Sequence, residues 1–105
     1  MFNVIGTDTY LKEVHGWPSD YKEIVGKIPA RLAVNPFLGD PLGYPFLREK
    51  RIREKRVYYL VYEDLKLVLL VAVSGKKDQQ ATIDHIKTQL DDYRKVAEDV
   101  VKRVS

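Results

Sequence analysis

The chain has 105 residues, 45% of them hydrophobic, and carries 18 lysines and arginines against 15 acidic residues. This length predicts a single domain, residues 1–105, with a small core. The absence of cysteine excludes disulfides and thiolate metal sites, and no apolar run approaches the roughly 20 residues that a bilayer span needs. We therefore expect a cytoplasmic protein without a secretory signal. The high charged fraction and the few Asn and Gln residues favour a thermophilic source.

The first third of the chain predicts a strand and two helices. Residues 2–5 alternate between apolar and polar side chains, as a short strand does. Thr7 or Asp8 can cap the short helix that follows. Residues 19–32 place apolar side chains at helical spacing and predict the second helix. Pro29 lies inside that pattern and predicts a kink or a restart, because proline has no N–H to donate.

The middle of the chain predicts a loop followed by three strands. Residues 35–45 contain three prolines and two glycines, which is typical of a loop. Strands are expected at residues 46–53, 56–63 and 66–74. The last of these is an almost continuous apolar run, which is typical of a strand covered on both faces.

The last third predicts one long helix over residues 78–103. At about 1.5 Å per residue it would be roughly 38 Å long, whereas a domain of this size is about 30 Å across. We expect it to overhang the core and leave an apolar seam bare. A second copy or a partner protein would cover the seam, or the second helix would fold alongside it. The seam has heptad spacing and consists of Ile83, Ile86, Leu90, Tyr93, Ala97, Val100 and Val104.

These elements predict an α+β fold. A small antiparallel sheet would pack against two N-terminal helices and a long C-terminal helix, in the order β-α-α-β-β-β-α.

Positive charge is concentrated between residues 48 and 56. Two acidic residues offset the six cations there, so this segment is +4 while the whole chain is +3. A solvent-facing cationic strand pair suits a polyanion, and nucleic acid is the commonest one. A solvated sheet face, or phosphate binding without chemistry, would give the same pattern. The six cations are Arg48, Lys50, Arg51, Arg53, Lys55 and Arg56.

Three segments in this order give the chain a family resemblance. The first is Leu47–Ile52, with an Arg four residues after its Leu, and the second is Lys55–Leu60, an Arg followed by apolar and Tyr residues. The third is Leu69–Gln80, an apolar strand that ends in paired lysines. The combination resembles the RelE/ParE toxin superfamily, and is most similar to its RelE and HigB-type branches.

The resemblance implies the toxin of a toxin–antitoxin pair, most of which cleave messenger RNA, many of them on the ribosome. It implies no metal or cofactor, and we expect an acidic antitoxin as partner. The matching positions imply a catalytic role for Arg56, Lys76 and Lys77. Phosphates would bind along Arg48, Lys50, Arg51, Arg53 and Lys55, and a base would stack on Tyr58. Arg51 and Arg53 are expected on the same strand face.

One departure from the family keeps other functions open. RelE-type nucleases usually place an Arg and a Tyr soon after the last strand, whereas Tyr93 and Arg94 lie well into the predicted helix here. The alternatives are a ParE-like gyrase poison, an inactive homologue, and an interaction domain that forms a homodimer through its C-terminal helix. His85 lies off the apolar seam and is a weak candidate for catalysis.

Overall fold

The computed structural model describes residues 1–104, with only the backbone described at Val104. Its five strands form one sheet in the order β1-β5-β4-β3-β2. The β1 strand pairs parallel to β5, and every other neighbouring pair is antiparallel. The sheet is therefore mixed, where the sequence predicted an antiparallel one. The strands are β1 (Asn3–Gly6), β2 (Asp40–Pro41), β3 (Leu47–Ile52), β4 (Lys55–Tyr62) and β5 (Leu67–Gly75).

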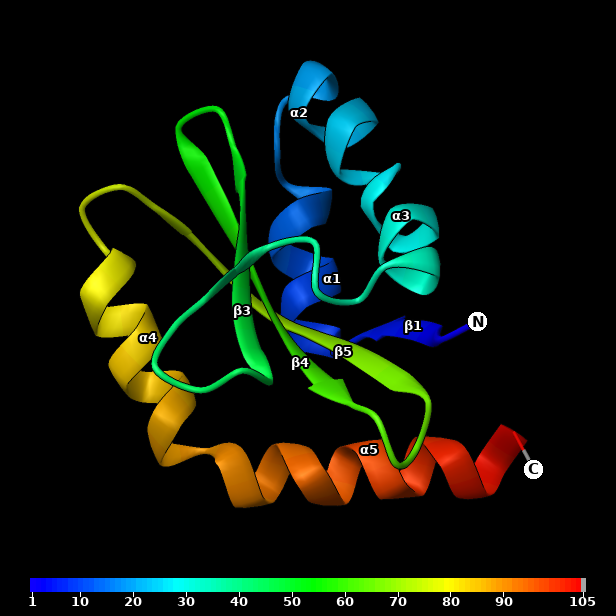
Figure 1. Ribbon diagram of the computed structural model, residues 1–105. Coiled ribbons are helices and arrows are strands. Elements are labelled where there is room, and N and C mark those ends of the chain that lie inside the picture. The colour runs from blue at the N-terminus through cyan, green and yellow to red at the C-terminus, as the bar shows by residue number, and fades with distance from the viewer. Residues whose placement is uncertain (105) are drawn as a thin grey trace.

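Helices cover both faces of the sheet, which makes three layers (Figure 1). The N-terminal helices α1, α2 and α3 pack on one face, around a core that includes Tyr59 of β4. The C-terminal helices α4 and α5 pack on the other face, around a core that includes Tyr58. The helices are α1 (Asp8–His15), α2 (Ser19–Val25), α3 (Ile28–Val34), α4 (Gln79–Thr88) and α5 (Leu90–Val104).

The structure confirms the α+β class and most of the predicted elements. Thr7 caps α1, because its hydroxyl accepts a hydrogen bond from the Tyr10 N–H. The predicted restart near Pro29 separates α2 from α3, so the N-terminal part has three helices and not two. The predicted loop at residues 35–45 contains the short strand β2, which pairs with β3.

The prediction of one long C-terminal helix is wrong. The chain turns sharply at Gln89, which separates α4 from α5 (Figure 1). The hydroxyl of Thr88 donates to the carbonyl of His85 at 2.7 Å, a local bond that competes with helix propagation. Asp91 and Asp92 then occupy the first turn of α5, where acidic side chains stabilise a new helix N-terminus.

The break lets both helices lie on the sheet, so the predicted overhang does not occur. The seam faces the core through Ile83, Ile86 and Ala97, which are buried, and through Leu90, Tyr93 and Val100, which pack against them. The side chain of Val104 lies outside the described residues. The seam packs against the sheet, whereas the N-terminal helices lie on the opposite face and do not cover it. Among residues 1–104, no helix is long and apolar enough to span a membrane.

Candidate functional site

Three polar side chains form a row across neighbouring strands. Arg51 of β3 pairs with Arg56 of β4, and Arg56 pairs with Ser74 of β5. Tyr58, two residues further along β4, packs in the core beneath α4 and α5. Because strand side chains alternate, Arg56 faces the same side. The register thus brings together two arginines that the sequence analysis assigned to phosphate, at the end of the sheet where β5 leads into α4.

The guanidinium of Arg56 is enclosed by two neighbouring side chains. Its side chain is only 8% exposed, and its Nε lies 3.4 Å from Oε1 of Glu49, which is also buried. The Gln79 amide donates to both carboxylate oxygens of Glu49, at 3.2 and 3.0 Å. Gln79 is the first residue of α4. The cation predicted to meet the reacting phosphate is therefore paired with Glu49 beneath the first turn of a helix.

Tyr58 does not offer its ring to solvent. Its side chain is fully buried, and its hydroxyl lies 2.8 Å from Oγ of Ser74. Burial raises the pKa of Tyr58, and the Ser74 hydrogen bond opposes part of that rise. A base needs an exposed aromatic face for stacking, so the predicted stacking role does not fit the position of Tyr58 in this fold.

Arg48 holds the loop before β3 in place. Its guanidinium donates to three backbone carbonyls, those of Gly39 at 3.0 Å, Pro45 at 2.8 Å and Phe37 at 3.2 Å. It also lies over the Phe37 ring, 5.2 Å from the centroid. The guanidinium is thus occupied by the protein itself, which does not fit the predicted phosphate contact.

The rest of the basic segment divides between the two faces of the sheet. Lys55 lies over the rings of Trp17 and Tyr21, on the side of the N-terminal helices. Arg53 has a positive φ of 54° in the β3–β4 turn and forms an ion pair with Asp20 of α2 at 2.7 Å. The prediction that Arg51 and Arg53 share a strand face is therefore wrong, because the turn ends the strand alternation.

The accessible cations lie around the end of the sheet that holds Arg56. Arg51 is exposed, and its Nε donates to the carbonyl of Arg53 at 3.2 Å. Lys76 and Lys77 are exposed in the connection between β5 and α4. Lys50 is half-buried and lies on the face opposite Arg51. Arg51, Lys76 and Lys77 are therefore the accessible cations at the end of the sheet that holds the buried Arg56.

A cluster of exposed aromatic side chains lies in and beside the loop before β3. The sequence pattern did not predict this exposed aromatic group. Phe37, Tyr44 and Phe46 are 39%, 41% and 36% exposed. The rings of Tyr44 and Phe46 stack with centroids 4.9 Å apart, and Nζ of Lys87 lies 5.8 Å from the Tyr44 ring centroid. The sequence did contain a signal for this cluster. Aromatic residues in a loop rich in proline and glycine indicate exposed rings, because such loops lie at the surface.

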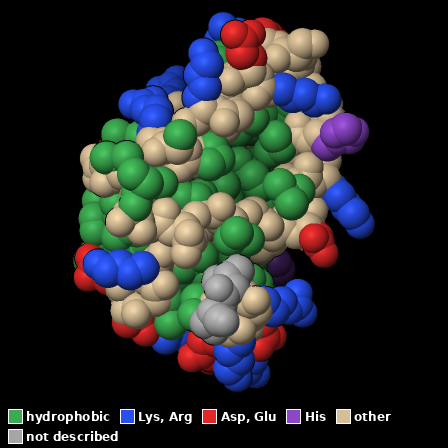
Figure 2. All heavy atoms as spheres, turned by 90° about the vertical axis from the view of Figure 1, so that its right-hand side faces the viewer, with side chains coloured by type: hydrophobic (Ala, Val, Ile, Leu, Met, Phe, Trp, Pro, Cys, Tyr) green, Lys and Arg blue, Asp and Glu red, His purple; other side chains and the backbone are tan. Residues whose placement is uncertain are grey.

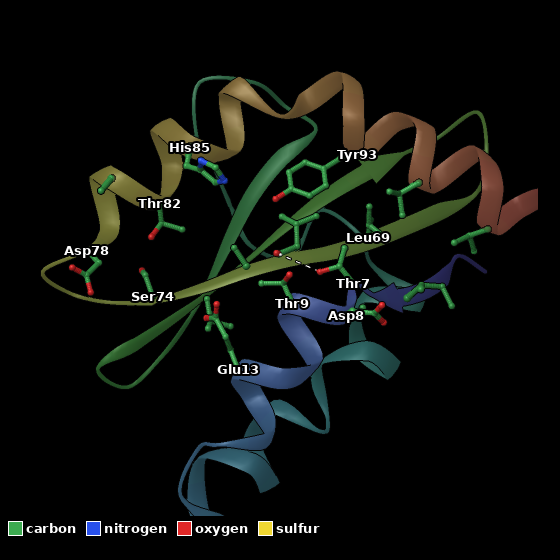
Figure 3. A pocket seen from close by; sticks show the side chains of 18 of the residues that line it. Thr7, Asp8, Thr9, Glu13, Leu69, Ser74, Asp78, Thr82, His85 and Tyr93 are labelled. Carbon is green, nitrogen blue, oxygen red and sulfur yellow. Dashed lines mark hydrogen bonds between the residues drawn. The ribbon is translucent and has the colours of Figure 1, made fainter.

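A groove of about 1000 Å³ runs between α1 and the two C-terminal helices, with β5 as its floor (Figure 3). Figure 3 shows Ser74, Thr82, His85 and Tyr93 along the side formed by β5 and the C-terminal helices. Ser74 also neighbours Arg56, so the groove adjoins the arginine row. Figure 2 shows hydrophobic side chains gathered at the centre of the end of the molecule where the two termini lie.

Arg94 and Tyr93 stabilise the packing of α5. Arg94 bonds both carboxylate oxygens of Asp64 in the β4–β5 turn, at 3.1 and 2.6 Å. This contact lowers the pKa of Asp64 and raises the pKa of Arg94. Tyr93 packs against the core on this face, and burial raises its pKa.

Within residues 1–104, no three His, Asp or Glu side chains are grouped closely enough to hold a metal ion.

Comparisons with solved structures identify the fold. A variant of the Escherichia coli RelE toxin in the free state matches with a TM-score of 0.70 and 18% identity, covering 83% of this chain and 96% of that one. A chain of the intact E. coli RelBE toxin–antitoxin complex matches with a TM-score of 0.64 and 19% identity, covering 71% and 96%. A chain of the RelBE2 toxin–antitoxin complex from Mycobacterium tuberculosis matches with a TM-score of 0.62 and 20% identity, covering 71% and 91%.

The chain therefore has the RelE-like fold, as the resemblance in its sequence implied. No protein family model matches the sequence, and no curated protein matches it either.

Proposed function

We propose that the chain is the toxin of a toxin–antitoxin pair and that it cleaves messenger RNA, in the cytoplasm and on ribosomes. The observation that carries the proposal is the pairing of Arg51 with Arg56 across β3 and β4, in a fold shared with RelE toxins. Lys76 and Lys77 add positive charge where β5 leads into α4. Together they supply cations for a phosphodiester at one end of the sheet.

The reaction would be attack of a ribose 2′-oxygen on the adjacent phosphorus. The new bond joins the 2′-oxygen to phosphorus, and the bond from phosphorus to the 5′-oxygen breaks. Glu49 is the carboxylate beside Arg56 and would accept the 2′-hydroxyl proton. Arg56 would bind two phosphate oxygens with its planar fork, and Lys76 or Lys77 would protonate the leaving 5′-oxygen.

The exposed aromatic group takes over the stacking role first assigned to Tyr58. Tyr44 and Phe46 present stacked rings at the surface, and Lys87 lies beside Tyr44. An exposed ring next to a cation suits a nucleotide, because the base stacks while the cation attracts its phosphate. Removing one ring should weaken RNA binding by roughly 1–3 kcal/mol.

Mapping of cellular RNA 5′ ends after induction of the chain tests the nuclease. Arg56→Lys keeps a cation beside the buried Glu49, which protects the fold, but loses the two-pronged phosphate contact. We expect new ends inside coding regions with the wild type and at least about tenfold fewer with Arg56→Lys. Lys95→Ala is the matched control, because Lys95 is exposed on α5. Equal cleavage by the wild type and Arg56→Lys would exclude Arg56 from the reaction.

An antitoxin partner belongs to the same proposal. Chains from two toxin–antitoxin complexes share the fold, and the cations around Arg51 need a neutralising surface. We expect an acidic protein that competes with RNA for Arg51, Lys76 and Lys77. Co-expression with the products of adjacent reading frames, followed by pull-down on the tagged chain, would detect such a partner. An acidic product that binds the wild type and an Arg51→Ala variant equally would contradict this placement.

The closed state of Arg56 supports a second candidate, a non-catalytic inhibitor such as a ParE-like gyrase poison. The guanidinium is buried and paired with Glu49, so this conformation presents no open phosphate site. A gyrase poison would leave cellular RNA intact and cause DNA breaks after induction. Intact RNA together with intact DNA would favour an inactive binding module over both toxins.

A further inference from the structure

Arg56 has binding capacity that the protein leaves unused. Its side chain is 92% buried, but the ion pair with Glu49 spans 3.4 Å, and neither its Nε nor its Nη1 makes a hydrogen bond with any described residue. A buried donor without an acceptor costs stability, and a buried charge is costly unless its pairing is well formed. Arg56 is thus a preformed anion site in which the Glu49 carboxylate is a poorly fitting occupant.

Gln79 keeps the Glu49 carboxylate on Arg56. Its amide nitrogen donates to both carboxylate oxygens, and it belongs to the first turn of α4. These two bonds fix the carboxylate against the guanidinium, and they place the start of α4 over the arginine. The link therefore runs from Arg56 through Glu49 to Gln79.

The first turn of α4 is held less firmly than the turns that follow it. Asp78 precedes the helix, but within residues 1–104 its side chain accepts no capping hydrogen bond, which lowers the cost of fraying this end. A Cβ at Gly75 would meet no described atom within 4 Å, so the preceding connection is sterically open. Ile83 and Ile86 anchor the following turns in the core.

We infer that Gln79 is a latch on a phosphate site at Arg56. In the closed state Gln79 holds Glu49 on Arg56. When the first turn of α4 frays, the carboxylate leaves, and a phosphodiester of single-stranded RNA takes its place on Arg56, flanked by Arg51. Opening also frees Glu49, the proposed proton acceptor. The choice of RNA as the ligand rests on the proposed function. The latch thus sets the fraction of molecules that can bind RNA at Arg56.

The test titrates the purified full chain with a 2′-O-methyl oligonucleotide, which binds but cannot be cleaved, and separately with inorganic phosphate. The NMR signal of the Arg56 Nε–H reports binding at the arginine itself, and its loss in Arg56→Lys assigns it. Gln79→Ala removes both bonds to Glu49, whereas Gln80→Ala is the matched control, because Gln80 bonds Asp84 on the exposed side of α4. We expect the oligonucleotide to bind Gln79→Ala about tenfold more tightly than the wild type or Gln80→Ala.

Equal affinity in the wild type, Gln79→Ala and Gln80→Ala would overturn the latch, as would an Arg56 signal that moves in none of them. Tightening with inorganic phosphate but not with the oligonucleotide would also overturn it, since the ligand would then be a small anion. Cleavage is assayed separately on unmodified RNA. If Gln79→Ala binds the oligonucleotide more tightly but no RNA is cleaved, the latch is supported and the nuclease is excluded. If RNA is cleaved but Gln79→Ala binds no more tightly at Arg56, the nuclease is supported and the latch is excluded.

Discussion

At the scale of single residues, Arg48 shows a cation stabilising the fold. It gathers the carbonyls of Phe37, Gly39 and Pro45. Arg48→Ala should lower the free energy of unfolding by about 1–2 kcal/mol, because three partly exposed charge-assisted bonds are lost. Urea unfolding followed by tryptophan fluorescence measures this. Arg31→Ala, at an exposed position of α3, should change stability by less than about 0.5 kcal/mol. Equal losses in the two variants would show that the backbone contacts of Arg48 do not stabilise the fold.

Tyr10 makes stability depend on pH. Burial raises its pKa from 10.0 to about 12, so the folded state holds the phenol proton more tightly than the unfolded state. Its contribution to the free energy of unfolding is fully present below pH 10 and is lost as the pH rises from 10 toward 12. By about pH 11 the loss is about 1.4 kcal/mol. Tyr10→Phe removes this ionisation, so the free energy of unfolding of the variant should fall less between about pH 9 and pH 11 in urea titrations. An equal fall with pH in the wild type and the variant would contradict this prediction.

Residue roles were predictable where they depend on neighbours in sequence. The Thr7 cap follows from the position of Thr7 before a helical pattern, and it is confirmed. The burial of Tyr58 depends on which face of β4 the C-terminal helices cover, and sequence alternation alone does not reveal that. The pairing of Glu49 with Arg56 and Gln79 joins three separate elements, so no local pattern could predict it.

At the scale of elements, most strands were predictable and the path of the C-terminal helices was not. A basic segment located β3, alternation located β4 and an apolar run located β5, but the short β2 was missed, and the heptad seam continues through the break at Gln89. A continuous seam cannot distinguish one helix from two that both face the sheet. Thr88, Asp91 and Asp92 carried the missing local signal, as a competing hydroxyl and an acidic first turn.

Ala97 fixes how closely α5 approaches the sheet. Its side chain is fully buried, so Ala97→Leu inserts three carbon atoms into a filled space. We expect a loss of about 1–3 kcal/mol, which lowers Tm by roughly 4–8 °C per kcal/mol for a domain of this size. Calorimetry measures Tm, and Lys95→Leu on the exposed side of α5 should leave it nearly unchanged. An unchanged Tm for Ala97→Leu would mean that α5 packs loosely.

At the scale of the whole molecule, the sheet divides the +4 segment, so that only part of its charge reaches one surface. Arg48, Arg53 and Arg56 are engaged by protein partners. The accessible set at the end of the sheet comprises three cations, Arg51, Lys76 and Lys77, because Lys50 lies on the opposite face. The net charge of +3 therefore says less about RNA binding than this local arrangement does.

The salt dependence of RNA binding tests this arrangement. Three phosphate contacts predict that log K falls with log salt at a slope of about −2, which is roughly a 20-fold loss between 50 and 200 mM salt. The double variant Lys76→Ala, Lys77→Ala should reduce the slope by about 1.4, measured by fluorescence anisotropy with a 2′-O-methyl oligonucleotide. The pair Lys22→Ala, Lys27→Ala removes the same charge from the exposed surface around α2 and should leave the slope unchanged. Equal reductions in both pairs would mean that net charge, and not the end of the sheet around Arg56, attracts the RNA.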